Sequence, residues 1–136
     1  SLVLMFQKEV ADRIISKFNN SNYGRLSILS SWKLNVKKIL DIKPQSFSPR
    51  PKIDSSLLLF TPKENFFKLK DPKNLEKITR IFFSQRRKML KKPFNQVFDN
   101  GKEVAEKFGI DLNLRPQNLE PEVYFKLVKE YEDLRG

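Results

Sequence analysis

The sequence contains no histidine and no cysteine. Without these side chains the chain has no ordinary zinc ligands, no disulfides and no serine–histidine or cysteine–histidine nucleophile. Its four glycines, at positions 24, 101, 109 and 136, stand alone, so the chain also lacks a glycine-rich phosphate-binding loop. Any catalysis within this chain would have to use carboxylates, lysines or tyrosines. We therefore expect no metal site, and the lack of cysteine fits a reducing cytoplasm.

Long apolar runs are missing as well. No stretch approaches the roughly 18 residues that span a bilayer, and the opening SLVLMF is too short for a signal-peptide core. We expect a cytoplasmic protein with no membrane partner. The 136 residues are about one domain in length. The chain starts with Ser1 directly on a strand-like run, which predicts a fragment of a longer protein.

The first part of the chain predicts strands and helices in alternation. Residues 2–6 indicate a strand, and apolar residues at helical spacing predict helices over 7–18 and 23–32. Residues 35–42 fit a strand or a helix; a strand is favoured because a proline-rich loop and the clear β-run 53–60 follow. The last two segments would then form a hairpin.

After Pro62 the pattern becomes helical, so we place a domain boundary there, between 1–62 and 63–136. Asp71 and Pro72 predict a helix start, with the aspartate as N-cap. An apolar stripe on that helix is expected to face the core, and the helix is expected to break or restart before Pro93. Further helices are predicted over 94–98, over 102–108 with Gly109 as C-cap, and from 121 to about 134. The stripe comprises Leu75, Ile78, Phe82 and Met89.

Positive charge is concentrated in one quarter of the chain. The net charge is +11, and residues 63–92 hold eleven basic and three acidic residues, a net charge of +8. If one helix continues through this region, several cations share the face opposite the apolar stripe. This face is either merely solvated or a phosphate-binding surface; the like charges destabilise the free chain, which favours a polyanionic partner. The expected basic face comprises Lys73, Lys77, Arg80, Arg87 and Lys91.

The stretch QSFSPRPKIDSS, residues 45–56, joins the two hairpin strands. Its prolines fix φ and stiffen the loop. It is either a rigid connector, with Phe47 in the core, or a loop that holds the Phe47 ring at the mouth of a site. The residues alone favour the first interpretation, because aromatic side chains usually fill cores.

Five blocks follow one another along the chain: MFQKEVADRI (5–14), YGRLSI (23–28), SFSPRPKIDSSLLLF (46–60), FFSQRRKML (82–90) and GIDLNLRPQNLEPEVYFKL (109–127). In order and spacing they resemble the later part of the KsgA-type family, the small-subunit ribosomal RNA adenine dimethyltransferases. That family transfers methyl groups from S-adenosylmethionine to N6 of two adjacent adenines near the 3′ end of small-subunit (16S) RNA.

The resemblance implies an α+β fragment: the tail end of a Rossmann-like methyltransferase sheet (a hairpin plus helices) in 1–62, followed by a small all-α RNA-binding domain in 63–136. The family's glycine-rich cofactor motif and catalytic tetrad lie upstream of anything matched here. We therefore expect no S-adenosylmethionine bound to this chain, and no methylation by it alone.

The resemblance also implies roles for individual residues. Phe47 would stack on the extruded target adenine, which returns part of the lost base stacking. Arg50 and Lys52 would reach flanking phosphates, and Arg25 would contact RNA or cap a neighbouring helix. Small-subunit RNA in the 30S subunit is the expected partner. The remaining expected RNA-binding residues are Lys73, Lys77, Arg80, Arg86, Arg87, Lys88, Lys91 and Lys92.

Two other functions remain open at this point. The chain fits a non-enzymatic RNA- or ribosome-binding assembly module, and it also fits a basic structural domain with no nucleic-acid role. The sequence leaves the oligomeric state open as well, since strands 2–6 and 53–60 would expose edges that favour an edge-strand dimer.

Overall fold

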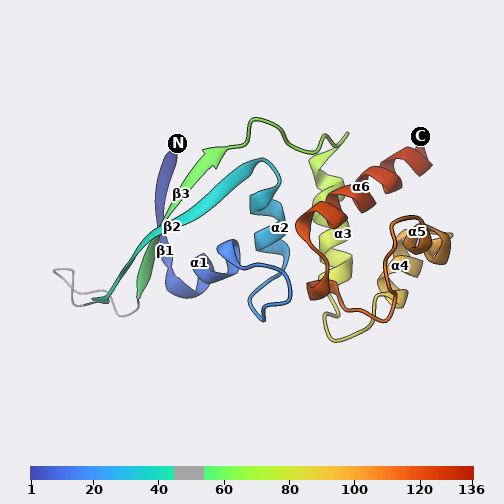
Figure 1. Cartoon of the computed structure of the whole chain (residues 1–136), viewed down its shortest axis with the longest axis horizontal. Coiled ribbons are helices and arrows are strands. Elements are labelled where there is room, and N and C mark those ends of the chain that lie inside the picture. The colour runs from blue at the N-terminus through green and yellow to red at the C-terminus, as the bar shows by residue number, and fades with distance from the viewer. Residues whose placement is uncertain (45–53) are drawn as a thin grey trace.

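A computed structural model describes residues 1–44 and 54–136, which form a small α+β structure (Figure 1). The first part contains three strands and two helices: β1 (Leu2–Gln7), α1 (Lys8–Ile15), α2 (Arg25–Ser31), β2 (Leu34–Ile42) and β3 (Ser55–Pro62). Within the described residues, no helix combines the length and the apolarity that crossing a membrane requires.

The second part is entirely helical. It contains α3 (Pro72–Phe83), α4 (Lys91–Val97), α5 (Gly101–Lys107), a short 3-10 turn (Pro116–Asn118) and α6 (Pro121–Arg135). In Figure 1 the sheet and α1 lie at one end of the molecule and α3 to α6 at the other, with α2 between them.

The sheet is antiparallel, and β3 lies between β1 and β2. The expectation that strand 53–60 would expose an edge is therefore wrong, because β3 is paired on both sides; β1 and β2 are the outer strands of the described sheet. The expected strand over 35–42 and its pairing with the following strand are confirmed. The pair next to the segment that connects the two strands is Ile42 with Ser55. A register shift between Lys38 and Leu40 interrupts the β2–β3 pairing, as a β-bulge does.

Among the described residues, two hydrophobic cores stabilise the structure. The small one joins α1 to the sheet through Ala11, Ile14 and Leu58. The large one lies among the helices, and it includes Tyr23 and Trp32, which precede the expected boundary at residue 62. The helix α2 therefore packs into the core of the helical part as well as against the sheet.

The helix α3 begins where the sequence predicts. Pro72 occupies its first turn, and the Asp71 carboxylate accepts a hydrogen bond from the Lys73 N–H at 2.9 Å. Burial of Leu75 and Phe82 confirms most of the expected stripe.

A break before Pro93 is confirmed, but it begins earlier than the stripe predicts, because α3 ends at Phe83 and α4 starts at Lys91. Pro93 has no N–H to donate, so it fits only the first turn of a new helix. The Leu90 N–H is also taken by the Leu114 carbonyl at 2.8 Å. As a result Met89 is 49% exposed instead of buried.

Buried polar groups tie the helical part together. The Glu132 carboxylate near the end of α6 accepts hydrogen bonds from the N–H groups of Lys70 and Asp71, both at 2.9 Å, and from the Asn74 amide at 2.8 Å. The Tyr23 hydroxyl donates to the Leu119 carbonyl at 2.6 Å. Burial, aided by the Glu120 charge, raises the pKa of Tyr23, so this hydroxyl keeps its proton.

Glycine at position 109 is required by the backbone. Gly109 has a φ of +65° and follows Phe108, the C-cap residue of α5, so it ends the helix as the sequence predicts. The Ile110 N–H donates to the Ala105 carbonyl at 2.8 Å, which closes the end of the helix.

Candidate RNA-binding surface and polar pocket

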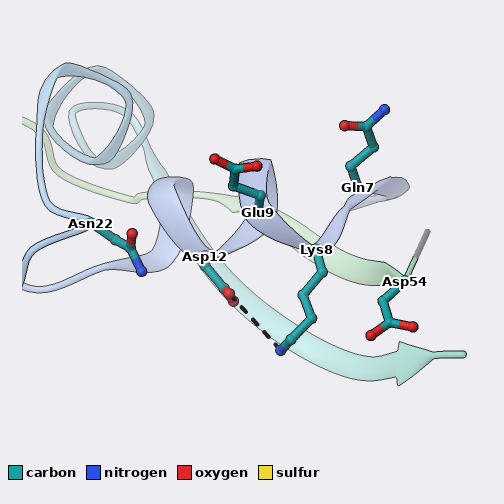
Figure 2. A pocket seen from close by; sticks show the side chains of 6 residues that line it. All are labelled: Gln7, Lys8, Glu9, Asp12, Asn22 and Asp54. Atoms are coloured by element: carbon teal, nitrogen blue, oxygen red, sulfur yellow. Dashed lines mark ion pairs between the residues drawn. The ribbon is translucent and has the colours of Figure 1, made fainter.

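A polar pocket of about 310 Å³ lies where β1 passes into α1 (Figure 2). Gln7, Lys8 and Glu9, which form this junction, all line the pocket. Asp54 lines it from the start of β3, and its carbonyl accepts a hydrogen bond from the Lys8 N–H at 2.9 Å. The pocket therefore joins the β1–α1 junction to the second strand of the hairpin.

A charged cluster lies beside this pocket, at the end of β2 and the start of β3. Asp41 accepts a hydrogen bond from the Ser56 hydroxyl at 2.6 Å, and its other oxygen lies 3.1 Å from the Lys38 ammonium and 3.8 Å from that of Lys8. The hydrogen bond from Ser56, followed by that from Lys38, lowers the pKa of Asp41. These contacts connect the end of β2, the start of β3 and α1.

Three of the expected site residues, Phe47, Arg50 and Lys52, lie outside the described residues. The strands on either side, β2 and β3, are described, and their last pair before the connecting segment is Ile42 with Ser55. The roles of the three residues therefore stay predictions.

A second concavity, of about 700 Å³, contains three arginines, and we call it the arginine groove. Arg13 of α1, Arg25 of α2 and Arg86 of the turn after α3 line it, together with one acidic residue, Glu76. The Arg25 guanidinium donates to the Glu76 carbonyl at 3.1 Å and points its Nε toward the Thr79 hydroxyl at 3.4 Å. Arg25 thus contacts the middle of α3 rather than a helix end, and two expected RNA-binding residues meet in one groove.

The cations of α3 have different surroundings. Lys73 and Arg80 are exposed, whereas the Lys77 ammonium donates to the Tyr131 hydroxyl at 2.7 Å and lies 5.1 Å from the centre of that ring. Lys77 therefore already has a partner on α6. Arg87 does not share the helix face of Lys73, because the helix ends before it.

The other expected cations form a compact basic surface around the turn between α3 and α4. Arg87 and Lys88 are exposed in the turn, and Lys91 and Lys92 are exposed in the first turn of α4. Arg86, half-buried, lies with its guanidinium 5.9 Å from the Phe83 ring. Among residues 1–44 and 54–136, none of these five cations forms an ion pair.

Two arginines of this region were not among the residues expected to bind RNA. Arg13 belongs to the arginine groove, although its guanidinium also lies 2.9 Å from the Glu9 carboxylate. Arg115 lies beside the basic turn and donates from its Nε to the Arg87 carbonyl at 3.0 Å. Both lie inside blocks that carry the family resemblance, Arg13 in 5–14 and Arg115 in 109–127, but neither was assigned a role there.

No group of three or more carboxylates in the described part of the chain is arranged to hold a metal ion. The structure instead offers a polar pocket beside the hairpin, an arginine groove lined by both parts of the chain, and a basic surface around the turn between α3 and α4. Guanidinium groups bind phosphate through two parallel hydrogen bonds, so the chemistry of this surface suits an anionic polymer.

Comparison with curated proteins identifies clear relatives. Ribosomal RNA small subunit methyltransferase A of Pelagibacter ubique (strain HTCC1062) is 98% identical over 136 residues, which are 100% of this chain and 52% of that protein. The protein of the same name from Ehrlichia ruminantium (strain Gardel) is 46% identical over 121 residues, 88% of this chain and 45% of its own length. The chain thus spans about half the length of the curated relatives it matches.

Solved structures of two methyltransferases also superpose on this chain. A dimethyladenosine transferase from Plasmodium falciparum superposes with a TM-score of 0.75 at 29% identity, covering 96% of this chain and 56% of that one. The 23S rRNA methyltransferase ErmE, at 14% identity, a TM-score of 0.63 and coverage of 96% and 54%, shares the fold. The family described as Ribosomal RNA adenine dimethylase matches residues 1–133. The chain therefore belongs to the ribosomal RNA adenine dimethylase family.

Proposed function

We propose that this chain is the RNA-binding and target-base portion of an S-adenosylmethionine-dependent enzyme that dimethylates two adjacent adenines near the 3′ end of small-subunit (16S) ribosomal RNA. Family membership and the names of its relatives support this assignment. Residues 1–62 would complete a Rossmann-like methyltransferase domain and residues 63–136 would form a helical RNA-binding domain. The protein would act in the cytoplasm, on RNA in the 30S subunit.

The basic surface is the observation that carries this proposal. Five cations lie within seven residues of sequence, and within the described chain they have no acidic partner. Like charges at this spacing destabilise the free protein by a few tenths of a kcal/mol per pair. Phosphate groups would relieve that repulsion and release counterions, which makes RNA binding favourable and salt-dependent. The five are Arg86, Arg87, Lys88, Lys91 and Lys92.

The polar pocket supports the proposal that this chain helps to hold the target base. It is lined by Asp54, which directly follows the 45–53 segment in sequence, and by the β1–α1 junction. An adenine extruded from its RNA strand would need hydrogen-bond partners for its edge and a ring face for stacking. We assign the partners to the neighbourhood of this pocket and the ring to Phe47.

We infer that S-adenosylmethionine needs residues that this chain does not contain. The chain has no glycine-rich turn, because its four glycines stand alone, and the polar pocket is lined mainly by carboxylates and amides. We assign the cofactor to the half of the full-length relatives that this chain does not match, and we derive no step of methyl transfer from the residues present.

RNA binding across a salt series tests the proposal. The chain would be titrated with an RNA that carries the small-subunit 3′ hairpin, beside a variant in which the five cations of the turn are changed to glutamine. Each lost phosphate contact removes roughly 0.7 to 0.9 from the slope of log K against log salt, so the loss of five contacts should flatten a steep slope by about 3.5 to 4.5 in the variant.

A matched control separates the position of the charge from its amount. Five exposed lysines elsewhere would be changed to glutamine, which removes the same charge. We expect this control to keep most of the slope. A wild-type chain that binds RNA weakly, with no difference between the two variants, would contradict the proposal and favour a basic structural domain. The control lysines are Lys17, Lys37, Lys102, Lys126 and Lys129.

The non-enzymatic alternative is tested with the full-length Pelagibacter relative, which is 98% identical to this chain. Methyl transfer from S-adenosylmethionine to the adenines of 30S subunits would support the enzyme. Binding to 30S subunits without any methyl transfer would support an assembly module instead.

A further inference from the structure

Two apolar side chains are exposed within the basic surface. Met89 is 49% exposed, and Leu114, in the loop between α5 and α6, is 37% exposed. Single exposed apolar residues are common on protein surfaces and need no explanation. These two differ because the backbone brings their segments together.

The segments that carry them are joined by two hydrogen bonds. The Leu90 N–H donates to the Leu114 carbonyl at 2.8 Å, and the Arg115 Nε donates to the Arg87 carbonyl at 3.0 Å. The Leu90 side chain is completely buried, so it anchors the turn in the core directly beside Met89. The connections from α3 to α4 and from α5 to α6 accordingly lie side by side in Figure 1.

Exposed cations flank both apolar residues. The one exposed carboxylate close to Leu114 in sequence, that of Asp111, accepts the Asn113 N–H at 2.9 Å and caps its own turn. An apolar protein surface could contact Met89 and Leu114, but it would leave the surrounding cations without anionic partners. A polyanion pairs with the cations and also needs an apolar part to contact the two side chains. The flanking cations are Arg87, Lys88, Lys91, Lys92 and Arg115.

RNA has both features. Its shallow minor groove presents ribose carbons and base edges between two lines of phosphate. Methionine and leucine are among the side chains that proteins press into a minor groove or between base steps. Anionic lipid is the other polyanion with apolar parts, but this surface carries no tryptophan, since the single one, Trp32, is buried in the helical core.

We propose that Met89 and Leu114 form an apolar contact at the centre of the basic surface, which packs against the ribose and base edges of bound RNA. This inference rests on the proposed function, because it requires the chain to bind RNA. The cations then supply the salt-dependent part of the affinity, and the apolar pair supplies a part that salt does not screen.

The test uses polar variants of similar volume, Met89→Gln together with Leu114→Asn. Both side chains are exposed, so folding should be unaffected, and a urea midpoint within error of wild type checks this. Binding to the 3′ hairpin RNA is measured across the same salt series. We expect the affinity to fall roughly fivefold to tenfold at every salt concentration, with an unchanged slope of log K against log salt.

A control with the same substitutions elsewhere is available. Met5→Gln with Leu134→Asn changes two residues that are 56% and 57% exposed and lie on β1 and at the end of α6. We expect this control to bind RNA as the wild type does. An equal loss in the control would overturn the inference, because the effect would then belong to surface apolarity in general.

The remaining outcomes are distinct. If the wild-type chain shows no salt-dependent RNA binding, the proposed function fails, and this inference fails with it. If wild type binds but the Met89/Leu114 variant binds equally well, the function stands and the apolar contact is refuted. A variant that keeps RNA affinity but loses binding to phosphatidylserine vesicles would assign the contact to a membrane, which also refutes it.

Discussion

Replacing Glu132 with glutamine tests whether a buried charge holds α6 to the start of α3. Glu132 is 5% exposed, and the two oxygens of its carboxylate accept three hydrogen bonds. Two of the donors are backbone N–H groups at the N-terminus of α3, where a negative charge also interacts favourably with the helix dipole.

The expected loss follows from these contacts. Glutamine has one oxygen, so it keeps one acceptor, while its NH₂ group faces the N–H group that the lost oxygen served. One buried N–H is left unpaired, and the remaining bonds lose their charge. Hydrogen bonds to charged groups contribute about 1.5 to 3 kcal/mol, so we expect the free energy of unfolding to fall by about 2 to 3 kcal/mol. With a urea m value of about 1.5 to 2 kcal/mol/M, the midpoint would fall by roughly 1 to 2 M.

The pH dependence identifies the charge as the cause. Burial by itself would raise the pKa of Glu132, but the hydrogen bonds from Asn74, Lys70 and Asp71 outweigh it and lower the pKa. A carboxyl with a lowered folded-state pKa stabilises the fold above its ordinary pKa of 4.5, and this stabilisation is lost as the pH falls through the folded-state value. The difference between wild type and Glu132→Gln should therefore be full at pH 7 and shrink at pH 4 and below.

Urea titrations at pH 7 and at lower pH, followed by far-ultraviolet circular dichroism, measure both effects. Glu106→Gln is the matched control, because Glu106 is exposed on α5 and we expect its loss to change stability by less than about 0.5 kcal/mol. The reasoning is refuted if Glu132→Gln is no less stable than this control, or if its deficit stays the same across the pH range.

Two further predictions concern the buried Tyr23 hydroxyl and the target base. Tyr23→Phe removes the hydroxyl that donates to the Leu119 carbonyl in a fully buried position, so urea titration should give a loss of about 1 to 2 kcal/mol; an unchanged midpoint would show that this bond contributes nothing. In the full-length Pelagibacter relative, alanine at the position of Phe47 should lower methyl transfer to 30S subunits roughly tenfold to a hundredfold and leave 30S affinity intact, whereas tyrosine should preserve activity. Equal activity of the alanine and tyrosine variants would refute the stacking role.

Local signals predicted much of the fold. A proline after an aspartate specified the start of α3, and a glycine with positive φ specified the end of α5, because each depends on neighbours within a few residues. The hairpin of β2 and β3 was predicted from β-propensity and from the prolines between the strands. Such features are fixed before any tertiary contact is made.

The errors arose where distant segments decide the outcome. In the turn after α3, the Leu90 N–H donates to the carbonyl of Leu114, 24 residues along the chain, and no helical periodicity contains that information. The same limit applies to the site. Arg25 and Lys77 looked like free cations in the sequence, but their partners, Glu76 and Tyr131, are 51 and 54 residues away. The role of Phe47 stays a prediction.

The helix α2 has a consequence for how members of this family can exchange parts. It precedes β2 and β3 in the chain, yet Tyr23, Ile28 and Trp32 complete the core formed mainly by α3 to α6. A chimaera joined at residue 63 would combine the helical half of one relative with three core side chains of another. Recombination at that point should therefore produce poorly packed hybrids unless these three residues are exchanged together with the helices they fit.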